Sequence, residues 1–475
     1  MTGQSIPLHR HARSLAAKDR PKAPNSVIRA PVIVNNRSVH DTFTRPVWAE
    51  ISRSRLLHNY RALRALAGSD ITVAAVIKGN AYGHGIHICA PWLAAEGAEW
   101  LGVTTVEEGV AVRALCPQPR IYVMASFWRG EAGTLLAHRL TPSVWEPYHL
   151  EELAAAARRA HLAPQSVPVH LEIDTGMSRQ GVAPGSALDQ LLQLLKSFPE
   201  LRLEAIMTHF FAPDELGSPA TGDQIRRFAT AADTIVAAGF RPSILHAGNS
   251  TTLLTGYGLQ TLRDLAARRS ARLMLRTGLA LYGYAPAVTS SIPAQPEEHF
   301  IAAEKADLAF RPEPRSGEAE GPAVSSSSQQ EAPHLLPVLC LKSRIISLRT
   351  IAPGDTAGYN ATFRATRPTR LALLPIGYGD GLSRLLSNRG HALVRGHRAP
   401  IAGRVSMDQT ILDVTGIPAA IGDEAVLIGE QPSAEPNSPG EVTRITAADL
   451  ATLCQTIPWE ILTSIAARVH RVPVD

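Results

Sequence analysis

The sequence lacks any uninterrupted apolar run of the roughly 18 residues that a membrane-spanning helix needs. No apolar signal-peptide core follows the first methionine, so we expect neither a membrane span nor a secretory leader. Cysteine is scarce, since only four are present, and no two of them form a C-x-x-C pair. A disulfide framework and a thiolate metal site are therefore not expected, and a reducing, cytoplasmic setting fits best.

The chain has 475 residues, of which 45% are hydrophobic and 19% charged, and this is enough for a large core and two domains. The formal net charge is only +5, so nucleic acid is not an expected partner. Much of the basic excess lies in residues 1–45, which carry eight Lys or Arg and two acids. We predict a basic disordered N-terminal extension there, although a transit peptide has a similar composition. Residues 287–335 are rich in Pro, Glu, Ala and Ser, which predicts a low-complexity linker insertion.

Residues 46–286 alternate short runs of Val, Ile and Leu with longer segments of helical periodicity. The runs expected to be strands are Ile71–Lys78, Trp100–Thr105, Arg120–Ser126, Thr141–Glu146, Pro168–Asp174, Leu203–His209, Ser243–Asn249 and Leu273–Gly278. Helices are expected at Pro147–Ala160, Ser186–Lys196 and Thr221–Ala238. Eight such units in about 240 residues predict an α/β fold with a (β/α)8 TIM-like barrel, although an open doubly wound sheet has the same local pattern.

Residues 336–475 change to alternating runs punctuated by turns, which predicts a mostly β C-terminal domain. Its expected strands are Val338–Ile346, Thr369–Leu374, His391–Val394, Thr410–Val414 and Glu424–Ile428. Two helices are expected near the end of the chain, at Ala447–Cys454 and Trp459–Val469.

In a β/α barrel the reactive side chains gather where the strands end. Lys78 ends the first run, where desolvation would lower the pKa of its amine and free it for imine formation; a lysine at the barrel rim is the ordinary alternative. Ser250, Gly278 and Leu279 fall in the two loops that commonly build a barrel phosphate site, although singly they also suit a cap or a turn.

The stretch 75–85, AVIKGNAYGHG, resembles the cofactor-lysine signature of the alanine racemases, a family of pyridoxal-phosphate enzymes. The resemblance covers about residues 46–286 and 336–472. It implies a barrel followed by a β domain, pyridoxal 5'-phosphate as the cofactor, no metal, and interconversion of L- and D-alanine by two bases acting at Cα. It also implies a cytoplasmic homodimer that supplies D-alanine for peptidoglycan, or that catabolises it.

Carried over position by position, the resemblance implies that Lys78 holds the cofactor covalently and acts as one base. Tyr359 matches the second base, which in this family comes from the partner subunit. Arg276 matches an arginine that faces the pyridine nitrogen, with His209 bound to it. The implied cofactor-binding residues are Lys78, Tyr82, Arg179, His209, Asn249, Ser250, Arg276, Gly278 and Leu279, and the implied substrate-binding residues are Arg179, Met407 and Tyr378.

Two positions depart from the family pattern. Glu172 stands where many relatives carry a carbamylated lysine, and we expect its carboxylate to present that negative charge to Arg179 directly. Trp459 stands where relatives often place a phosphate-contacting tyrosine. An indole donates only through its N–H, so a reshaped pocket and a broader racemase that accepts serine form the alternative function.

Other enzyme classes fit less well. A barrel decarboxylase would place a carboxylate rather than Arg276 near the pyridine nitrogen, and a non-catalytic cofactor carrier would be a single barrel. A Schiff-base aldolase would leave Tyr359 without a role. A metallohydrolase would need a carboxylate-rich cluster, whereas His84 and His87 stand alone.

Overall fold

The computed structural model describes residues 44–290, 333–434 and 440–475. Most of the predicted basic extension, 1–45, and of the predicted linker, 287–335, lies outside the described residues. Among the helices of the described part, none is both long and apolar enough to cross a membrane.

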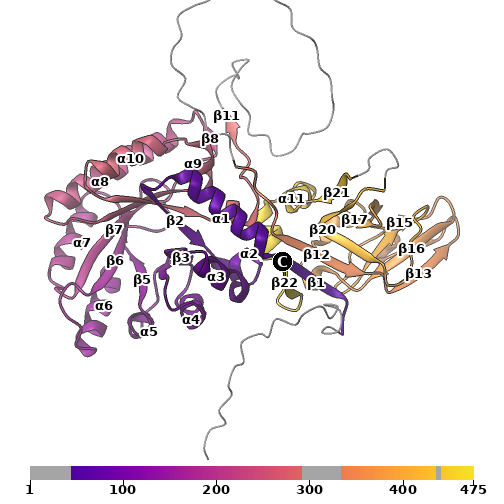
Figure 1. The fold of residues 1–475 in the computed structure, drawn as a ribbon, viewed down its shortest axis with the longest axis horizontal. Coiled ribbons are helices and arrows are strands. Elements are labelled where there is room, and N and C mark those ends of the chain that lie inside the picture. The colour runs from indigo at the N-terminus through magenta and orange to yellow at the C-terminus, as the bar shows by residue number, and fades with distance from the viewer. Residues whose placement is uncertain (1–43, 291–332, 435–439) are drawn as a thin grey trace, which may run out of the picture. The chain divides into compact units, whose positions relative to one another are not determined.

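Eight parallel strands close into a barrel, which confirms the predicted fold (Figure 1). Each predicted run contributes one barrel strand, so the open-sheet alternative is wrong. In order around the barrel the strands are β10 (Arg272–Thr277), β2 (Ile71–Val76), β3 (Trp100–Val103), β4 (Arg120–Val123), β5 (Leu140–Val144), β6 (Val167–Glu172), β7 (Leu201–Met207) and β9 (Ile244–Asn249). Trp100, Tyr122 and Met274 are buried and pack together, so large side chains fill the barrel interior.

Helices connect the strands and cover the outside of the barrel, as Figure 1 shows. They are α1 (Arg53–Ala67), α2 (Lys78–Tyr82), α3 (Ile86–Ala95), α4 (Val106–Leu115), α5 (Ala132–Ala137), α6 (Pro147–Arg159), α7 (Ser186–Lys196), α8 (Pro219–Ala237), α9 (Ser250–Thr255) and α10 (Leu259–Ala267), with a short 3-10 helix η2 (Leu279–Tyr282) after β10. The predicted helices correspond to α6, α7 and α8. In α6, Pro147 occupies the first turn, and Leu150, Leu153 and Ala157 recur at helical spacing and are buried.

The C-terminal part is mostly β, also as predicted. A seven-stranded sheet has the order β18 (His397–Pro400), β17 (His391–Val394), β20 (Glu424–Pro432), β12 (Leu339–Arg344), β1 (Val47–Ser52) and β22 (His470–Val474), with β21 (Val442–Ile445) pairing with β20. The smaller sheets are β13 (Ser347–Ile351), β16 (Thr369–Leu374) and β19 (Thr410–Asp413); β14 (Thr356–Ala357) and β15 (Phe363–Arg364); and β8 (Glu215–Leu216) and β11 (Thr289–Ser290). Two helices, α11 (Ala447–Cys454) and α12 (Pro458–Thr463), complete this part, with 3-10 turns η3 (Tyr359–Ala361), η4 (Tyr378–Asp380) and η5 (Arg384–Leu386).

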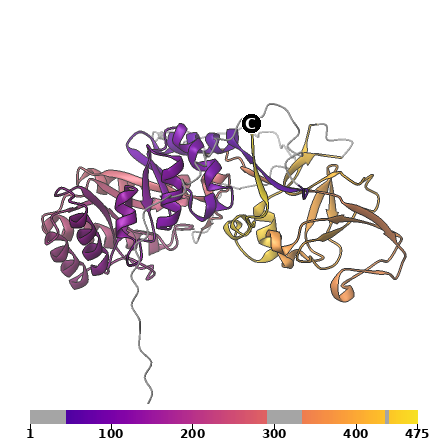
Figure 2. The same ribbon diagram turned by 90° about the horizontal axis from the view of Figure 1, so that it is seen from below.

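Strand β1 departs from the predicted domain boundary at residue 46. It lies within the range predicted for the barrel, but it pairs antiparallel with β12 and parallel with β22 in the second sheet. Figures 1 and 2 show this indigo strand beside orange and yellow strands. Because the chain enters the β domain first and only then begins α1, the two ends of the described chain meet in one sheet.

The last predicted helix, Trp459–Val469, ends early. Helix α12 stops at Thr463, and the guanidinium of Arg471 then donates to the carbonyl oxygens of Ile465, Ala466 and Val469 at 2.5–2.7 Å. A continuing helix would have used these carbonyl groups internally. The same guanidinium donates to the Gly83 carbonyl at 2.9 Å and so ties the chain end to the barrel.

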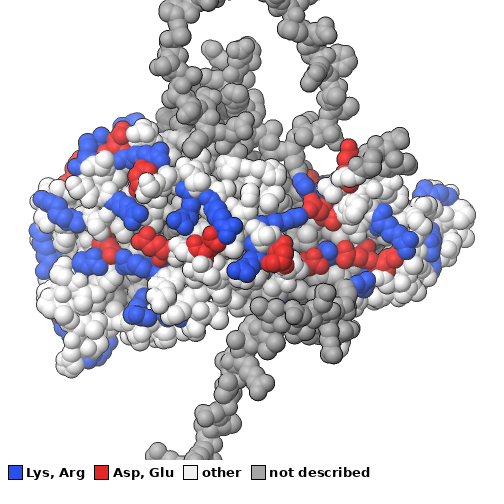
Figure 3. Space-filling model, in the orientation of Figure 1, with Lys and Arg blue, Asp and Glu red and all other residues white. Residues whose placement is uncertain are grey.

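Charged side chains of both signs are interspersed on the face drawn in Figure 3. Basic and acidic residues alternate there over the barrel and over the β domain. This face therefore carries no large patch of one sign.

Candidate active site

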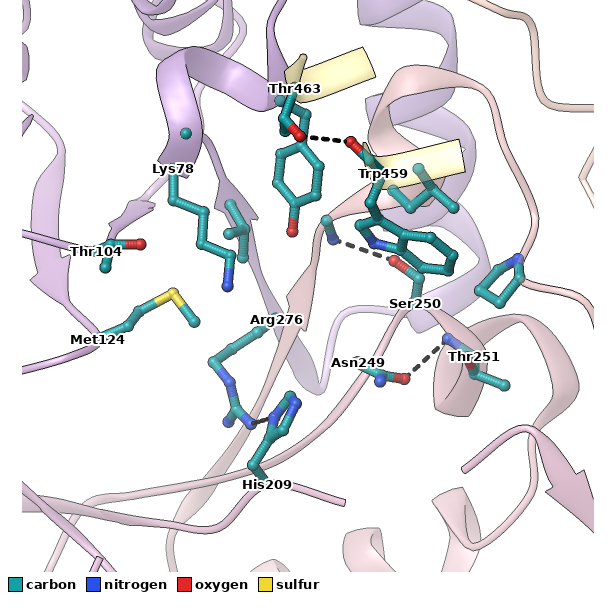
Figure 4. Close-up of a pocket in the computed structure, with 16 residues that line it drawn as sticks. Lys78, Thr104, Met124, His209, Asn249, Ser250, Thr251, Arg276, Trp459 and Thr463 are labelled. Atoms are coloured by element: carbon teal, nitrogen blue, oxygen red, sulfur yellow. Dashed lines mark hydrogen bonds between the residues drawn. The ribbon is translucent and has the colours of Figure 1, made fainter. Parts of the chain in front are cut away.

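A cavity of about 470 Å³ opens at the carboxyl ends of the barrel strands. Eight of the predicted residues line it together: Lys78, Tyr82, His209, Asn249, Ser250, Arg276, Gly278 and Leu279. Figure 4 shows Lys78, His209, Asn249, Ser250 and Arg276 arriving from several strand ends around one space. The remaining lining residues are Val76, Gly79, Thr104, Met124, Thr251, Pro286, Trp459 and Thr463.

Lys78 is separated from the buried strand β2 only by Ile77 and extends into this cavity. Burial lowers the pKa of its amine, and the charges of Arg179 and Arg276 lower it further, whereas Glu108 acts in the opposite direction. A lowered pKa leaves more of the amine unprotonated at neutral pH. The lysine is therefore suited to attack a carbonyl group or to accept a proton.

The four residues after Lys78 form a left-handed turn. Gly79, Asn80, Ala81 and Tyr82 have φ of 61°, 55°, 56° and 51°. Three of them carry a side chain that disfavours this conformation, so the surroundings must hold the turn in place. The buried ring of His84 does so in part, with its Nδ1 at 3.0 Å from the carbonyl oxygens of both Ala81 and Tyr82.

Tyr82, Ser250 and Gly278 form a polar corner at one end of the cavity. The Ser250 hydroxyl accepts from the Gly278 N–H at 3.1 Å and from the Ala280 N–H at 3.4 Å. A Cβ on Gly278 would lie 2.4 Å from the Tyr82 hydroxyl, so only glycine leaves room for the phenol there. Asn249 caps α9, because its Oδ1 accepts from the Thr251 N–H at 3.0 Å.

Arg276 lies buried at the opposite end of the cavity between two histidines. It donates to His246 Nδ1 at 3.2 Å and to His209 Nδ1 at 3.1 Å, and also to the carbonyl oxygens of His246 and Thr208. Because arginine has no acceptor, both Nδ1 atoms must be unprotonated. Burial and the positive charge of Arg276 lower the pKa of His209 to about 3, which keeps that ring neutral. Within the described residues, the Nε atom of Arg276 is buried and has no partner, so one donor of this guanidinium remains free.

Glu172 is buried but does not form the expected ion pair with Arg179 in the part of the chain that the structure describes. Its carboxylate accepts from Gln180 Nε2 at 2.6 Å, and Gln180 also donates to the Met124 carbonyl at 3.1 Å. Burial raises the pKa of Glu172 to about 7, although Gln180, Arg276 and Arg179 lower it in part. The negative charge that we expected at this position therefore develops only near neutral pH.

Replacing Glu172 by glutamine should stabilise the protein at alkaline pH. A carboxyl whose folded pKa is raised costs stability as the pH rises above its unfolded value near 4.5, and the full cost is reached once the pH exceeds the folded pKa of about 7. The amide keeps an oxygen that accepts from Gln180, so Glu172→Gln should gain up to roughly 3 kcal/mol at pH 8 and almost nothing at pH 4.5. Thermal unfolding of both proteins at the two pH values measures this, and an equal Tm difference at both would contradict it.

Tyr359, Tyr378 and Met407 do not line the cavity of this chain. They lie in the β domain, where they are 66%, 42% and 54% exposed. Met407 and Tyr378 are neighbours, because the Gly379 N–H donates to the Met407 carbonyl at 2.8 Å and the Tyr378 N–H to the Ser406 carbonyl at 2.9 Å. A Cβ on Gly358, beside Tyr359, would lie 3.0 Å from the Arg404 backbone nitrogen, so the backbone segments of Tyr359 and Tyr378 both border the loop 403–408, which contains Met407.

Arg179 lies in the loop after β6 and is exposed. It does not line the cavity, but its charge acts on Lys78, His209 and Arg276. The guanidinium therefore lies near enough to the site for its charge to lower the pKa values of Lys78, His209 and Arg276.

Trp459 and Thr463 reach the cavity from α12 in the β domain. Figure 4 places the indole of Trp459 beside Ser250, away from the Lys78 amine. Helix α12 approaches the barrel closely at Gly83, where a Cβ would lie 2.0 Å from the Leu462 carbonyl oxygen. Gly83 has a φ of 82°, so both the space and the backbone conformation require glycine there.

Several lining residues were not predicted from the sequence. Thr104 and Met124 follow β3 and β4 at the same edge as Lys78, so the strand-end rule would have located them. Neither carries a charge, and for that reason neither stood out. Thr463 and Pro286 had no comparable signal, since tertiary packing alone brings them to the cavity.

Comparison with known proteins identifies the family. Residues 51–286 match the family model described as alanine racemase, N-terminal domain, and residues 338–473 match alanine racemase, C-terminal domain. The chain is 37% identical over 435 residues to an alanine racemase of Sorangium cellulosum (strain So ce56), covering 90% of this chain and 98% of that protein.

Solved structures agree. The alanine racemase from Streptomyces coelicolor A3(2) is 30% identical with a TM-score of 0.71, covering 90% of this chain and 98% of that one. The alanine racemase of Clostridium difficile 630 is 26% identical with a TM-score of 0.73, covering 91% and 96%. The strand-end lysine, its glycine-rich turn and both domains thus occur together in a chain that belongs to the alanine racemase family.

Proposed function

We propose that this chain interconverts L- and D-alanine with two bases, Lys78 and Tyr359, that act on opposite faces of the substrate. As a member of the alanine racemase family it is a pyridoxal-phosphate-dependent isomerase. The observation that carries the proposal is the Lys78 amine, with its lowered pKa, in one cavity with the free Nε donor of Arg276.

The residues of the cavity fit the cofactor. Lys78 supplies the amine for a covalent bond to its aldehyde. The buried Nε of Arg276 has no partner among the described residues and can donate to the pyridine nitrogen. The corner formed by Tyr82, Ser250 and Gly278 gathers hydroxyl and backbone N–H groups, which suit a phosphate. We assign Asn249 and Leu279 to the same end and Arg179 to the cofactor hydroxyl.

Each of these residues has its own proposed role in the reaction. When bound, the cofactor supplies an electron-withdrawing ring that makes the substrate Cα acidic. Lys78 accepts or returns a proton on one face of Cα. Arg276 would donate to the pyridine nitrogen and leave it unprotonated, because a guanidinium hardly gives up a proton, and His209 fixes the orientation of Arg276. Inversion needs a second proton carrier on the other face, since a single base favours retention.

We propose that a second copy of the chain supplies this carrier. Tyr359 is 66% exposed and lies with Met407 and Tyr378 along one loop of the β domain. A homodimer would cover this group and bring it to the cavity of the other copy. There the Met407 backbone N–H would meet the substrate carboxylate together with Arg179, and Tyr378 would line the entrance.

The reaction serves either the supply or the catabolism of D-alanine. We propose a cytoplasmic enzyme that supplies D-alanine for bacterial peptidoglycan. The four cysteines are free thiols, as expected for a reducing compartment.

Trp459→Tyr should change cofactor binding rather than substrate choice. Because the indole lies beside Ser250, a tyrosine there adds a phenol at the phosphate end, and we expect the cofactor to bind about tenfold more tightly. The ratio of alanine to serine turnover should stay unchanged. Titration of the cofactor and parallel assays with both amino acids measure the two effects, and a shifted ratio would instead support the serine-accepting alternative.

The proposal is tested by incubating the purified full chain with pyridoxal phosphate and a mixture of L-alanine, L-serine and L-lysine, followed by chiral chromatography. D-alanine as the main product is the expected result. Comparable amounts of D-serine or D-lysine would show that the enzyme is a racemase of broader substrate range. Unchanged L-amino acids would refute racemisation.

A further inference from the structure

The carboxylate of Glu108 binds the backbone of the left-handed turn that follows Lys78. Glu108 Oε1 accepts from the Gly79 N–H at 2.8 Å and lies 3.5 Å from the Asn80 nitrogen. Its Oε2 accepts from the Thr104 N–H at 2.8 Å, at the end of the neighbouring strand β3. Glu108 therefore joins the backbone of the signature turn to the strand beside it.

The geometry requires a carboxylate. Successive N–H groups converge in a turn such as the one where the left-handed Gly79 follows Lys78, and they form a small nest for an anion. An ionised glutamate has two oxygens that only accept, so it satisfies the nest and Thr104 together. A glutamine would keep one accepting oxygen, but its NH2 group would point at the N–H donor on the other side, either at Thr104 or at the turn.

The negative charge of Glu108 also counteracts the effect of nearby positive charges on Lys78. The charged groups that act on the Lys78 amine are Arg179, Arg276 and Glu108, and the neutral ring of His209 and the phenol of Tyr82 line the same cavity. Both arginines favour the unprotonated amine, and Glu108 favours the protonated one. A base must hold a proton between its removal and its return, so an uncompensated pair of arginines would impair the lysine.

We propose that Glu108 is a positioning residue for Lys78, holding the left-handed turn against β3 and supplying the negative charge that balances Arg179 and Arg276. The role rests on the proposed function, because it concerns the base of the racemisation. Glu108 itself does not line the cavity, so it acts through Lys78 and the turn.

Three variants of the full chain separate the two parts of this role. Glu108→Gln removes the charge and one acceptor. Glu108→Asp keeps the charge, but its side chain is one methylene shorter and should not span both backbone groups. Glu107→Gln is the matched control, because Glu107 precedes Glu108 in the first turn of α4 and is exposed.

The first readout is the pH dependence of covalent bond formation between Lys78 and added pyridoxal phosphate, followed by absorbance. Glu108→Gln should lower the midpoint of this profile by about one pH unit, whereas Glu108→Asp and Glu107→Gln should leave it near that of the unmodified chain. The second readout is hydrogen exchange of peptides that contain residues 79–82 and 104. Exchange there should be at least tenfold faster in both Glu108 variants and unchanged in Glu107→Gln.

An unshifted midpoint together with unchanged exchange in Glu108→Gln would overturn the inference. If Glu108→Gln fails to fold, hydrogen exchange in Glu108→Asp is the deciding measurement. Unchanged exchange at residues 79–82 and 104 in that variant would then overturn the inference. Failure of the proposed function looks different, because the unmodified chain would then form no bond to pyridoxal phosphate, or Lys78→Ala would form the same bond.

Discussion

Lys78→Ala is expected to abolish racemisation, with kcat lowered by at least about 10⁴-fold. The lysine has two proposed roles, since it holds the cofactor covalently and is one of the two bases. General acid–base catalysis alone is worth about 10² to 10⁴-fold, and loss of the covalent attachment adds to this. The fold should survive, because Lys78 lies at the strand end and is not part of the packed core.

Reduction with borohydride and peptide mapping measure this directly. In the unmodified chain the reduced cofactor should be found on Lys78, and in Lys78→Ala it should be absent. Lys196→Ala is a suitable control, because Lys196 is exposed at the end of α7. A label on Lys196 or Lys342, or full activity of Lys78→Ala, would contradict the assignment.

Tyr359→Phe is expected to lower kcat by about 10² to 10⁴-fold while the cofactor still binds to Lys78. Phenylalanine keeps the ring and removes only the hydroxyl that carries the proton. Because Tyr359 is exposed in its own chain, little stability should be lost.

Mixing the two inactive variants tests whether the tyrosine acts in the other subunit. A dimer of one Lys78→Ala chain and one Tyr359→Phe chain contains a single site with both bases intact. With random pairing about a quarter of the unmodified activity should return. A mixture of Lys78→Ala with the double variant should stay inactive. No recovery from the first mixture, although mixed dimers form, would mean that both bases belong to one chain.

The barrel could be predicted because its signal is local. Buried parallel strands such as Ile71–Val76 are continuous apolar runs, and the residues that follow them meet at one edge whatever the helices do. The partners of β1 could not be predicted in this way. Val47–Ser52 pairs with strands far along the chain, and a short apolar run does not encode its neighbours.

The functional site likewise contains residues that could be predicted from the sequence and residues that could not. Strand ends with reactive groups, such as Lys78 and Arg276, were found in the sequence, whereas Thr104 and Met124 at equivalent positions were overlooked. The left-handed turn had two local signs, Gly79 and Asn80, but nothing in Ala81 or Tyr82 indicates a positive φ. The charge state of Glu172 depends on its burial and on Gln180, neither of which the residue type reveals.

The most direct test of two-base racemisation is the early reaction of L-alanine with the full chain and pyridoxal phosphate in D2O. We predict that the first D-alanine formed carries deuterium at Cα, while the remaining L-alanine is almost unlabelled, because one base removes the proton and another delivers a deuteron. D-alanine that retains the original hydrogen would mean that a single base returns it across the substrate. That result would contradict the proposed division of proton transfer between Lys78 and Tyr359.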